Sequence, residues 1–153
     1  MVEKGFELSE ASNTPIFYMM RIRGCHVTGE FVARDNVAPK HHNQAPVTPN
    51  REPEKIILPP FVYEQEREKI AERLPAAIRF VEEHALNEVF PGRFDSVGII
   101  TCGGSYNTVI RALQRQGLAD VYGDTDIPIY CLNVAYPLIP DELVQFCAGK
   151  EQV

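Results

Sequence analysis

The sequence has 153 residues, of which 44% are hydrophobic and 24% charged, and its formal net charge is −6. A chain of this size can bury one globular core. An acidic chain without a basic run offers no electrostatic footprint for a phosphate backbone, which argues against nucleic-acid binding. It also lacks an apolar run of the ~18 residues that a membrane span needs, and its N-terminus carries acidic residues where a signal peptide would be basic. We therefore expect a cytoplasmic protein that does not contact a membrane.

The potential metal ligands are scattered along the chain. The cysteines form no C-x-x-C pair and no cluster typical of zinc or iron–sulfur sites: Cys25, Cys102, Cys131 and Cys147. The last three lie in or beside apolar runs, where cysteine usually behaves as a small buried hydrophobe. His41 and His42 lie in an irregular proline-rich stretch and point in different directions. The sequence therefore predicts no metal site.

The first half of the chain predicts two structured segments joined by a connector. Residues 4–12 are typical of the last turns of a helix, and the apolar, β-branched run over residues 15–29 predicts a buried strand. Residues 37–61 are proline-rich and without periodicity, which indicates a connector. Apolar residues at helical spacing follow over residues 63–86, where Pro75 predicts a kink or two helices because it lacks an N–H group.

The second half alternates strands and helices. Apolar runs predict strands over residues 96–101 and 127–134, and helical periodicity predicts helices over residues 106–116 and 141–148. Gly117 is placed to end the first of these helices, and Pro140 to begin the second. The order predicts an α/β, Rossmann-like fold with three layers, in which a mostly parallel sheet has helices on both faces.

The turn after the first of these strands is the candidate binding site. Gly103, Gly104 and Ser105 lead from strand to helix, but the G-x-G-x-x-G fingerprint and the Gly-Lys-Ser/Thr of a P-loop are both absent. One interpretation is structural, with a glycine at positive φ and the Ser105 hydroxyl capping the helix. The other is that the free N–H groups of the helix N-terminus bind a phosphate or carboxylate.

No catalytic constellation is evident elsewhere in the sequence. A nucleophile elbow would need a closing glycine where Asn107 stands, and no histidine follows His84 to act as a base near that turn. His84 itself lies among charged residues of an amphipathic helix and is expected on its solvated face. We therefore assign no catalytic residue.

Four stretches nevertheless resemble one enzyme family. The segments VGIITCGGSYNTVIRALQRQGL and IPIYCLNVAYPLIPDELVQFCAGK resemble the transketolase C-terminal-type domain of the indolepyruvate ferredoxin oxidoreductase alpha subunit. The segments RIRGCHVTGEF and ERLPAAIRFVEEHALNEVFPG resemble the region of that subunit between its pyrimidine-binding and diphosphate-binding domains. The resemblance covers nearly the whole chain.

This resemblance implies a domain organisation and a set of cofactors. Residues 1–36 would be the end of a preceding pyrimidine-binding-type domain, and residues 62–153 a transketolase C-terminal-like domain truncated at its C-terminal edge. The complete enzyme would use thiamine diphosphate, magnesium and iron–sulfur clusters to oxidise an arylpyruvate and pass electrons to ferredoxin. This sequence departs from it, because Gly123-Asp124-Thr125 breaks the diphosphate motif and the cysteine series for clusters is missing. No cofactor is therefore expected in this chain.

Two functions remain open. The first is a non-catalytic structural and assembly domain of such an oxidoreductase, whose partners would be the remaining domains or subunits in a homo- or hetero-oligomer. The second is an independent α/β module that binds a small anion at Gly103-Gly104. The resemblance also places Arg21 and Arg23 near the active-site side of the preceding domain, where either could meet an anionic substrate or coenzyme. On a strand, Arg21, Arg23 and Cys25 would share one face, with His26 on the other.

Overall fold

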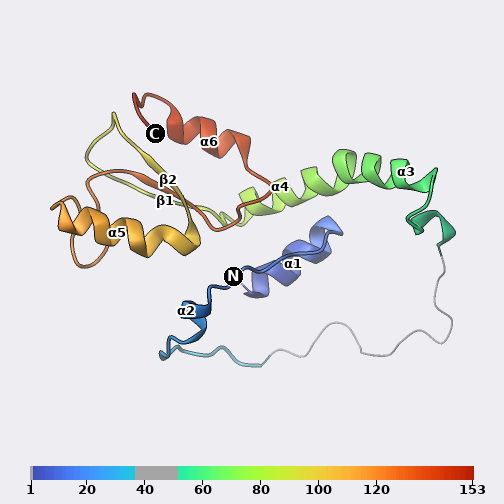
Figure 1. Ribbon diagram of the computed structural model, residues 1–153, viewed down its shortest axis with the longest axis horizontal. Coiled ribbons are helices and arrows are strands. Elements are labelled where there is room, and N and C mark those ends of the chain that lie inside the picture. The colour runs from blue at the N-terminus through green and yellow to red at the C-terminus, as the bar shows by residue number, and fades with distance from the viewer. Residues whose placement is uncertain (1, 37–51) are drawn as a thin grey trace. The chain divides into compact units, whose positions relative to one another are not determined.

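The computed structural model describes residues 2–36 and 52–153. The chain divides into two compact units (Figure 1), one formed by Met1–Tyr18 together with Lys69–Val153 and the other by Met19–Glu68. The first unit contains a sheet and most of the helices. The predicted connector, with His41 and His42, falls largely on residues outside those that are described.

A small mixed sheet forms the centre of the first unit. Its strands are β1 (Glu88–Phe90), β2 (Ile99–Cys102) and β3 (Ile129–Leu132), in the order β1-β3-β2. β2 and β3 run parallel, as predicted, whereas β1 pairs antiparallel with β3 and was not predicted. The sheet is therefore mixed, which corrects the expectation of a mostly parallel sheet.

Helices cover the two faces of this sheet. All four residues of β3 are buried, and successive side chains of a strand point to opposite faces. Ile129 packs with Ile110 and Leu113 of α5 (Tyr106–Arg115), whereas Tyr130 and Leu132 pack with Phe146 of α6 (Pro140–Cys147). Figure 1 shows these two helices on opposite sides of the strands. The predicted α/β class and its three layers are confirmed.

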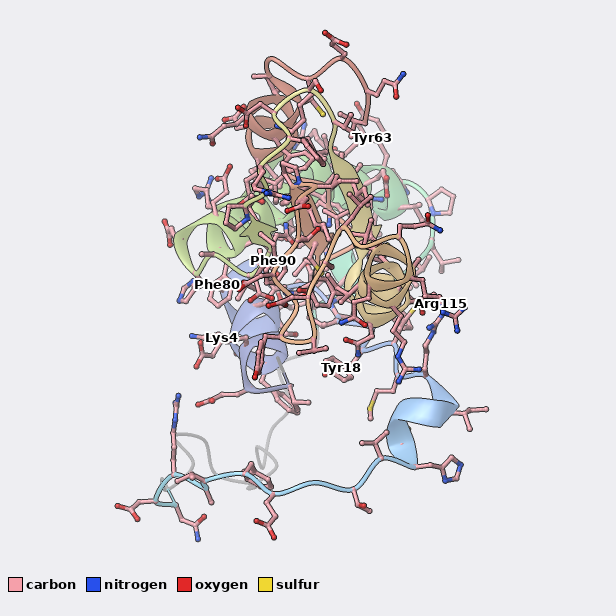
Figure 2. All side chains as sticks on the ribbon, turned by 90° about the vertical axis from the view of Figure 1, so that its left-hand side faces the viewer. Lys4, Tyr18, Tyr63, Phe80, Phe90 and Arg115 are labelled. Atoms are coloured by element: carbon pink, nitrogen blue, oxygen red, sulfur yellow. The ribbon has the colours of Figure 1, made fainter. Side chains whose placement is uncertain are left out.

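A separate hydrophobic cluster joins the N-terminal helix to the long helical segment. It contains residues of α1 (Val2–Ser12) and α4 (Leu74–Glu83), together with two residues from loops: Leu8, Ala77, Phe80, Val81, Leu86 and Ile139. Phe80, labelled in Figure 2, stacks on His84 with their ring centroids 3.9 Å apart. His84 is exposed, as predicted, although its Nδ1 also lies 3.0 Å from the Phe80 carbonyl oxygen.

Pro75 alters the helix as its chemistry requires. The π-helical turn η2 (Lys69–Arg73) lies between α3 (Phe61–Glu68) and α4, and it ends two residues before the proline. Pro75 has no N–H to donate to the carbonyl group four residues earlier, so the regular ladder is interrupted here. The predicted interruption is confirmed, as a change in helical winding.

The predicted strand over residues 15–29 is wrong. Residues 15–21 and 27–36 have no regular secondary structure, and Ile22–Cys25 form the short helix α2. A strand exists only when its backbone pairs with a neighbour, and no strand occurs among the described residues of the second unit. Apolar composition alone therefore gave the wrong element, and the face predicted for Arg21, Arg23 and Cys25 does not form.

Among the residues that the structure describes, no helix is both long and apolar enough to cross a membrane.

Candidate functional site

The candidate site lies where β2 and β3 end. The two parallel strands finish side by side, with Cys102 paired to Leu132, so Gly103 and Asn133 are the residues that follow at the same edge. In open α/β sheets, ligands bind outside the carboxyl ends of the strands. This edge is therefore the place where the predicted glycine turn has to be judged.

Close packing, not positive φ, explains the first glycine. Neither Gly103 nor Gly104 has a positive φ, and together with Ser105 they form the 3-10 turn η3 (Gly103–Ser105) that leads into α5. A Cβ atom on Gly103 would lie 2.7 Å from Oδ1 of Asn133. The glycine is needed because the Asn133 side chain occupies the space that a larger residue would fill.

The capping role predicted for Ser105 is also wrong. Ser105 stands at the N-cap of α5, but its side chain makes no capping hydrogen bond. Its backbone has helical dihedral angles, because the 3-10 turn already continues into the helix. A capping side chain needs an extended backbone at this position to reach the next N–H groups.

Asn133 is held in place by its own hydrogen bonds. Its Nδ2 donates to the carbonyl oxygen of Leu86 at 3.0 Å and to Oε2 of Glu88 at 2.7 Å. The thiol of Cys131 lies 3.8 Å from its Oδ1. The asparagine thus joins the end of β3 to the start of β1 and presents an acceptor oxygen towards the glycine turn.

A second polar network lies in the core on the α6 side. Asn87 donates from Nδ2 to Tyr130 Oη at 3.2 Å and to Glu142 Oε2 at 3.1 Å, and its Oδ1 accepts from the N–H of Val134 at 3.0 Å. The hydroxyl of Tyr130 donates to the same Glu142 carboxylate. Burial, and then the hydrogen bond to Glu142, raise the pKa of Tyr130 well above its ordinary value. The network ties α6 to β3 and to the residues that precede β1 and follow β3 at one end of the sheet.

The electrostatic character of the edge does not suit an anion. The pKa of the Cys131 thiol is raised, mainly by burial and then by the nearby Glu88 and Cys102. The thiol is therefore neutral and weakly nucleophilic. Burial, followed by Cys131, Glu88 and Asp124, raises the pKa of Tyr106 at the start of α5. Carboxylates and an acceptor oxygen near the helix N-terminus oppose the attraction that its dipole offers to a phosphate.

The thiols follow the prediction only in part. Cys131 is buried and Cys147 half-buried, whereas Cys102 is exposed at the end of β2 and Cys25 is exposed in the other unit. Among residues 2–36 and 52–153, no group of three or more His, Cys, Asp or Glu side chains could hold a metal ion.

The other predicted site residues lie in the second unit. Arg21 is exposed, and its carbonyl oxygen accepts from the N–H groups of Gly24 and Cys25 at 2.9 and 3.2 Å as α2 forms. The side chain of Arg23 lies outside the described residues. These arginines belong to one unit and the glycine turn to the other, and the role of the arginines towards an anion stays a prediction.

A shallow hollow of about 450 Å³ lies in the loop region before β3. It is lined in part by Arg93 and Asp126, whose side chains form a two-pronged ion pair with both distances at 2.6 Å. The hydrogen bond from Arg93 is the main reason that the pKa of Asp126 is lowered. Asp120 accepts from the N–H groups of Tyr122 and Asp124 at 2.8 and 2.9 Å. These polar groups hold the loop, so the hollow has no evident ligand chemistry.

Sequence reasoning missed the residues that organise this edge. Their hydrogen bonds join residues that lie far apart in the sequence, so no local pattern reports them: Asn87, Asn133, Tyr130 and Glu142. A usable signal was nevertheless present, because Asn133 directly follows a continuous apolar strand. A polar amide at the carboxyl end of a buried strand has to find partners there.

Fold and site together define a small α/β unit whose polar residues form hydrogen bonds between its own strands, helices and loops. Similarity to known proteins indicates the family more specifically. The chain is 29% identical over 151 residues to the indolepyruvate oxidoreductase subunit IorA of Methanothermobacter marburgensis, covering 97% of this chain and 22% of that protein. It is 26% identical over 149 residues to the subunit of the same name from Methanothermobacter thermautotrophicus, with the same coverage. The resemblance predicted from the sequence is confirmed.

The chain spans about a fifth of the length of these relatives. No family model matches the sequence. No solved structure matches it either.

Proposed function

We propose that this chain is a non-catalytic structural and assembly part of an indolepyruvate (2-oxoacid) ferredoxin oxidoreductase subunit, with a transketolase C-terminal-like fold. The observation that carries the proposal is similarity to two such subunits along 97% of the chain. The relatives are named for oxidation of indolepyruvate, and a chain that matches about a fifth of their length supplies a part of that machinery.

The side chains at the candidate site support a structural role. Asn133 donates to the Leu86 carbonyl oxygen, and Asn87 donates to the Glu142 carboxylate, so these side chains join parts of the fold. The pKa of the Cys131 thiol is raised. A catalytic group needs a reactive protonation state and access to substrate. These residues are instead arranged to fix the loops that follow β3 and precede β1.

The cofactors implied for the complete enzyme do not fit the described residues. An iron–sulfur cluster is held by a set of thiolates, and the described residues contain no group of three or more ligating side chains. Asp124, in the broken diphosphate motif, offers its backbone N–H to Asp120 in a turn. Thiamine diphosphate, magnesium and clusters therefore belong, in this proposal, to other parts of the enzyme.

The second unit supports an assembly role. None of its described residues is buried, and its large exposed hydrophobics include Met19, Phe31, Val32, Ile57 and Tyr63. Val32 is 97% exposed. Exposed apolar side chains in both described parts of this unit favour a role in which another protein part covers them. We assign that role to the remaining domains or subunits of the same oxidoreductase, for which ferredoxin would be the electron acceptor.

The alternative, a free-standing module that binds a small anion at Gly103-Gly104, is less well supported. The Oδ1 atom of Asn133 faces that turn, and an acceptor oxygen repels a phosphate or carboxylate.

Two measurements on the purified chain test the proposal. With indolepyruvate, coenzyme A, thiamine diphosphate, magnesium and ferredoxin, we expect no turnover above background, because in this proposal the cofactors are held by other parts of the enzyme. A ligand that binds only the native state stabilises it and raises the melting temperature. Because we expect no binding, melting curves with ATP, NAD or coenzyme A should show no upward shift. Turnover would contradict the non-catalytic role. A shift lost in a folded Gly104→Val variant would favour the anion-binding module.

A further inference from the structure

The loop between α5 and β3 is the feature that the proposed function does not use. Within it, Ala119 and Thr125 form an antiparallel bridge. The N–H group of Asp120 donates to the carbonyl oxygen of Asp124 at 2.9 Å, and Gly123 turns the chain with a φ of 99°. The loop is therefore a closed hairpin that its own backbone holds in shape.

The tip of this loop presents two apolar side chains to solvent. Val121 is 82% exposed and Tyr122 is 91% exposed. The N–H group of Tyr122 donates to Oδ1 of Asp120 at 2.8 Å, which fixes the backbone that carries the ring. An aromatic side chain on a fixed turn loses little conformational freedom on binding, and tyrosine is enriched among the residues that dominate protein interfaces.

The shallow hollow of about 450 Å³ lies beside this tip. Residues that precede and follow the tip line it, including Leu118, Ala119 and Asp124, but Val121 and Tyr122 do not. The Tyr122 ring therefore does not fill the hollow of its own chain. A hollow of this volume is larger than one aromatic side chain.

The hollow offers no chemistry for a small ligand, but its Arg93 can bind an aromatic ring. Nε and Nη2 of Arg93 donate to the two carboxylate oxygens of Asp126. All N–H groups of a guanidinium lie in its plane, so this ion pair leaves the two faces available, and the Arg93 side chain is 77% exposed. A guanidinium that is held in this way can stack on the face of a tyrosine.

We propose that two copies of this chain associate about a twofold axis at this loop, with Tyr122 of each copy in the hollow of the other and its ring stacked on Arg93. A twofold contact needs a surface that is complementary to itself. This loop meets that requirement, because it supplies the protruding ring and also borders the hollow that receives it. The contact involves the sheet unit alone and does not depend on the proposed function.

Sedimentation of the 153-residue chain over a range of concentrations tests this association. At physiological ionic strength, which screens the charges of Asp120 and Asp124, we expect a reversible monomer–dimer equilibrium. Tyr122→Ser removes both rings from the dimer and should raise its dissociation constant by about tenfold or more. Tyr122→Phe keeps the ring and should raise it much less. Val144→Ser is the matched control and should change nothing, because Val144 is 71% exposed on α6 and does not line the hollow.

Mixing two variants tests the reciprocal geometry. Arg93→Ala removes the stacking face, so neither this variant nor Tyr122→Ser forms a complete contact with itself. The mixed pair restores one contact, between Tyr122 of the first variant and Arg93 of the second, and should associate more tightly than either variant alone. Thermal unfolding verifies that each variant is folded.

Three results would overturn the proposal. The first is a native chain that stays monomeric even at about 1 mM. The second is a Tyr122→Ser chain that dimerises as well as the native chain, which would place the contact elsewhere on the molecule. The third is a mixture of the two variants that associates no better than its components.

Discussion

At the residue scale, the edge of the sheet depends on one asparagine and the glycine beside it. Asn133 donates two hydrogen bonds to the segment at the start of β1, and its Oδ1 lies where a Gly103 side chain would begin. Gly103, which the sequence places in a candidate binding turn, therefore has a packing role. The glycine is required by its neighbour and not by its own backbone angles.

The coupling between these two residues can be measured. Asn133→Ala should lower the free energy of unfolding by about 1–3 kcal/mol, because the Leu86 carbonyl group loses its donor. Gly103→Ala should be destabilising in the native background but much less so with Asn133→Ala, where the Oδ1 atom is gone. Urea unfolding of all four proteins gives the coupling. An equal cost of Gly103→Ala in both backgrounds would show that Asn133 is not the reason for the glycine.

Tyr130 gives the molecule an alkaline pH dependence. Because its pKa is raised in the folded state, its contribution to stability is complete below the ordinary tyrosine pKa of about 10 and is lost as the pH rises towards the folded value. Tyr130→Phe should reduce this alkaline loss, and should cost about 1 kcal/mol near neutral pH through its missing hydrogen bonds. Unfolding measured from neutral to alkaline pH tests this. Tyr122→Phe, which changes an exposed side chain, should leave the profile unchanged.

At the element scale, sequence reasoning succeeded where burial and local backbone chemistry decide the structure. The apolar runs predicted β2 and β3 because both are packed in the sheet, and Pro75 and Pro140 marked a helix interruption and a helix start. β1 was missed because a strand of three residues is too short to show a period.

Pairing and long-range contacts could not be predicted in the same way. The run over residues 15–29 has the composition of a strand, but composition does not supply the neighbour that a strand requires. The contact of Asn133 with Leu86 joins residues far apart in the sequence, so no spacing within either segment reports it. The glycine turn was located correctly, yet its purpose followed only from the side chain beside it.

The end of α5 offers a direct test of where glycine is needed for its backbone. Gly117 follows α5 with a φ of 72°, and no atom would obstruct a Cβ there. Gly117→Ala should therefore destabilise the protein by about 1 kcal/mol through the backbone alone. Gly104→Ala is the matched control, because Gly104 does not have a positive φ. Thermal unfolding compares the two, and a cost at Gly104 as large as that at Gly117 would contradict this assignment.

At the scale of the whole molecule, the two units differ in what they bury. The sheet unit has three hydrophobic clusters and fixed polar networks, whereas the described part of the other unit has no buried residue. Exposed apolar side chains in such numbers are typical of a segment that another protein part covers. This contrast, together with similarity to subunits about five times as long, places the chain within a larger assembly in our proposal.

The most direct test of that placement is purification of the tagged chain from its native cells, followed by mass spectrometry and by analysis of thiamine and iron in the purified material. We expect stoichiometric co-purification of polypeptides that carry the thiamine-diphosphate motif and cluster-binding cysteines, and indolepyruvate oxidation in that complex. A variant with Met19, Phe31 and Val32 changed to serine should lose these partners while its sheet unit stays folded. Recovery of the native chain alone, without thiamine, iron or activity, would contradict the proposed role.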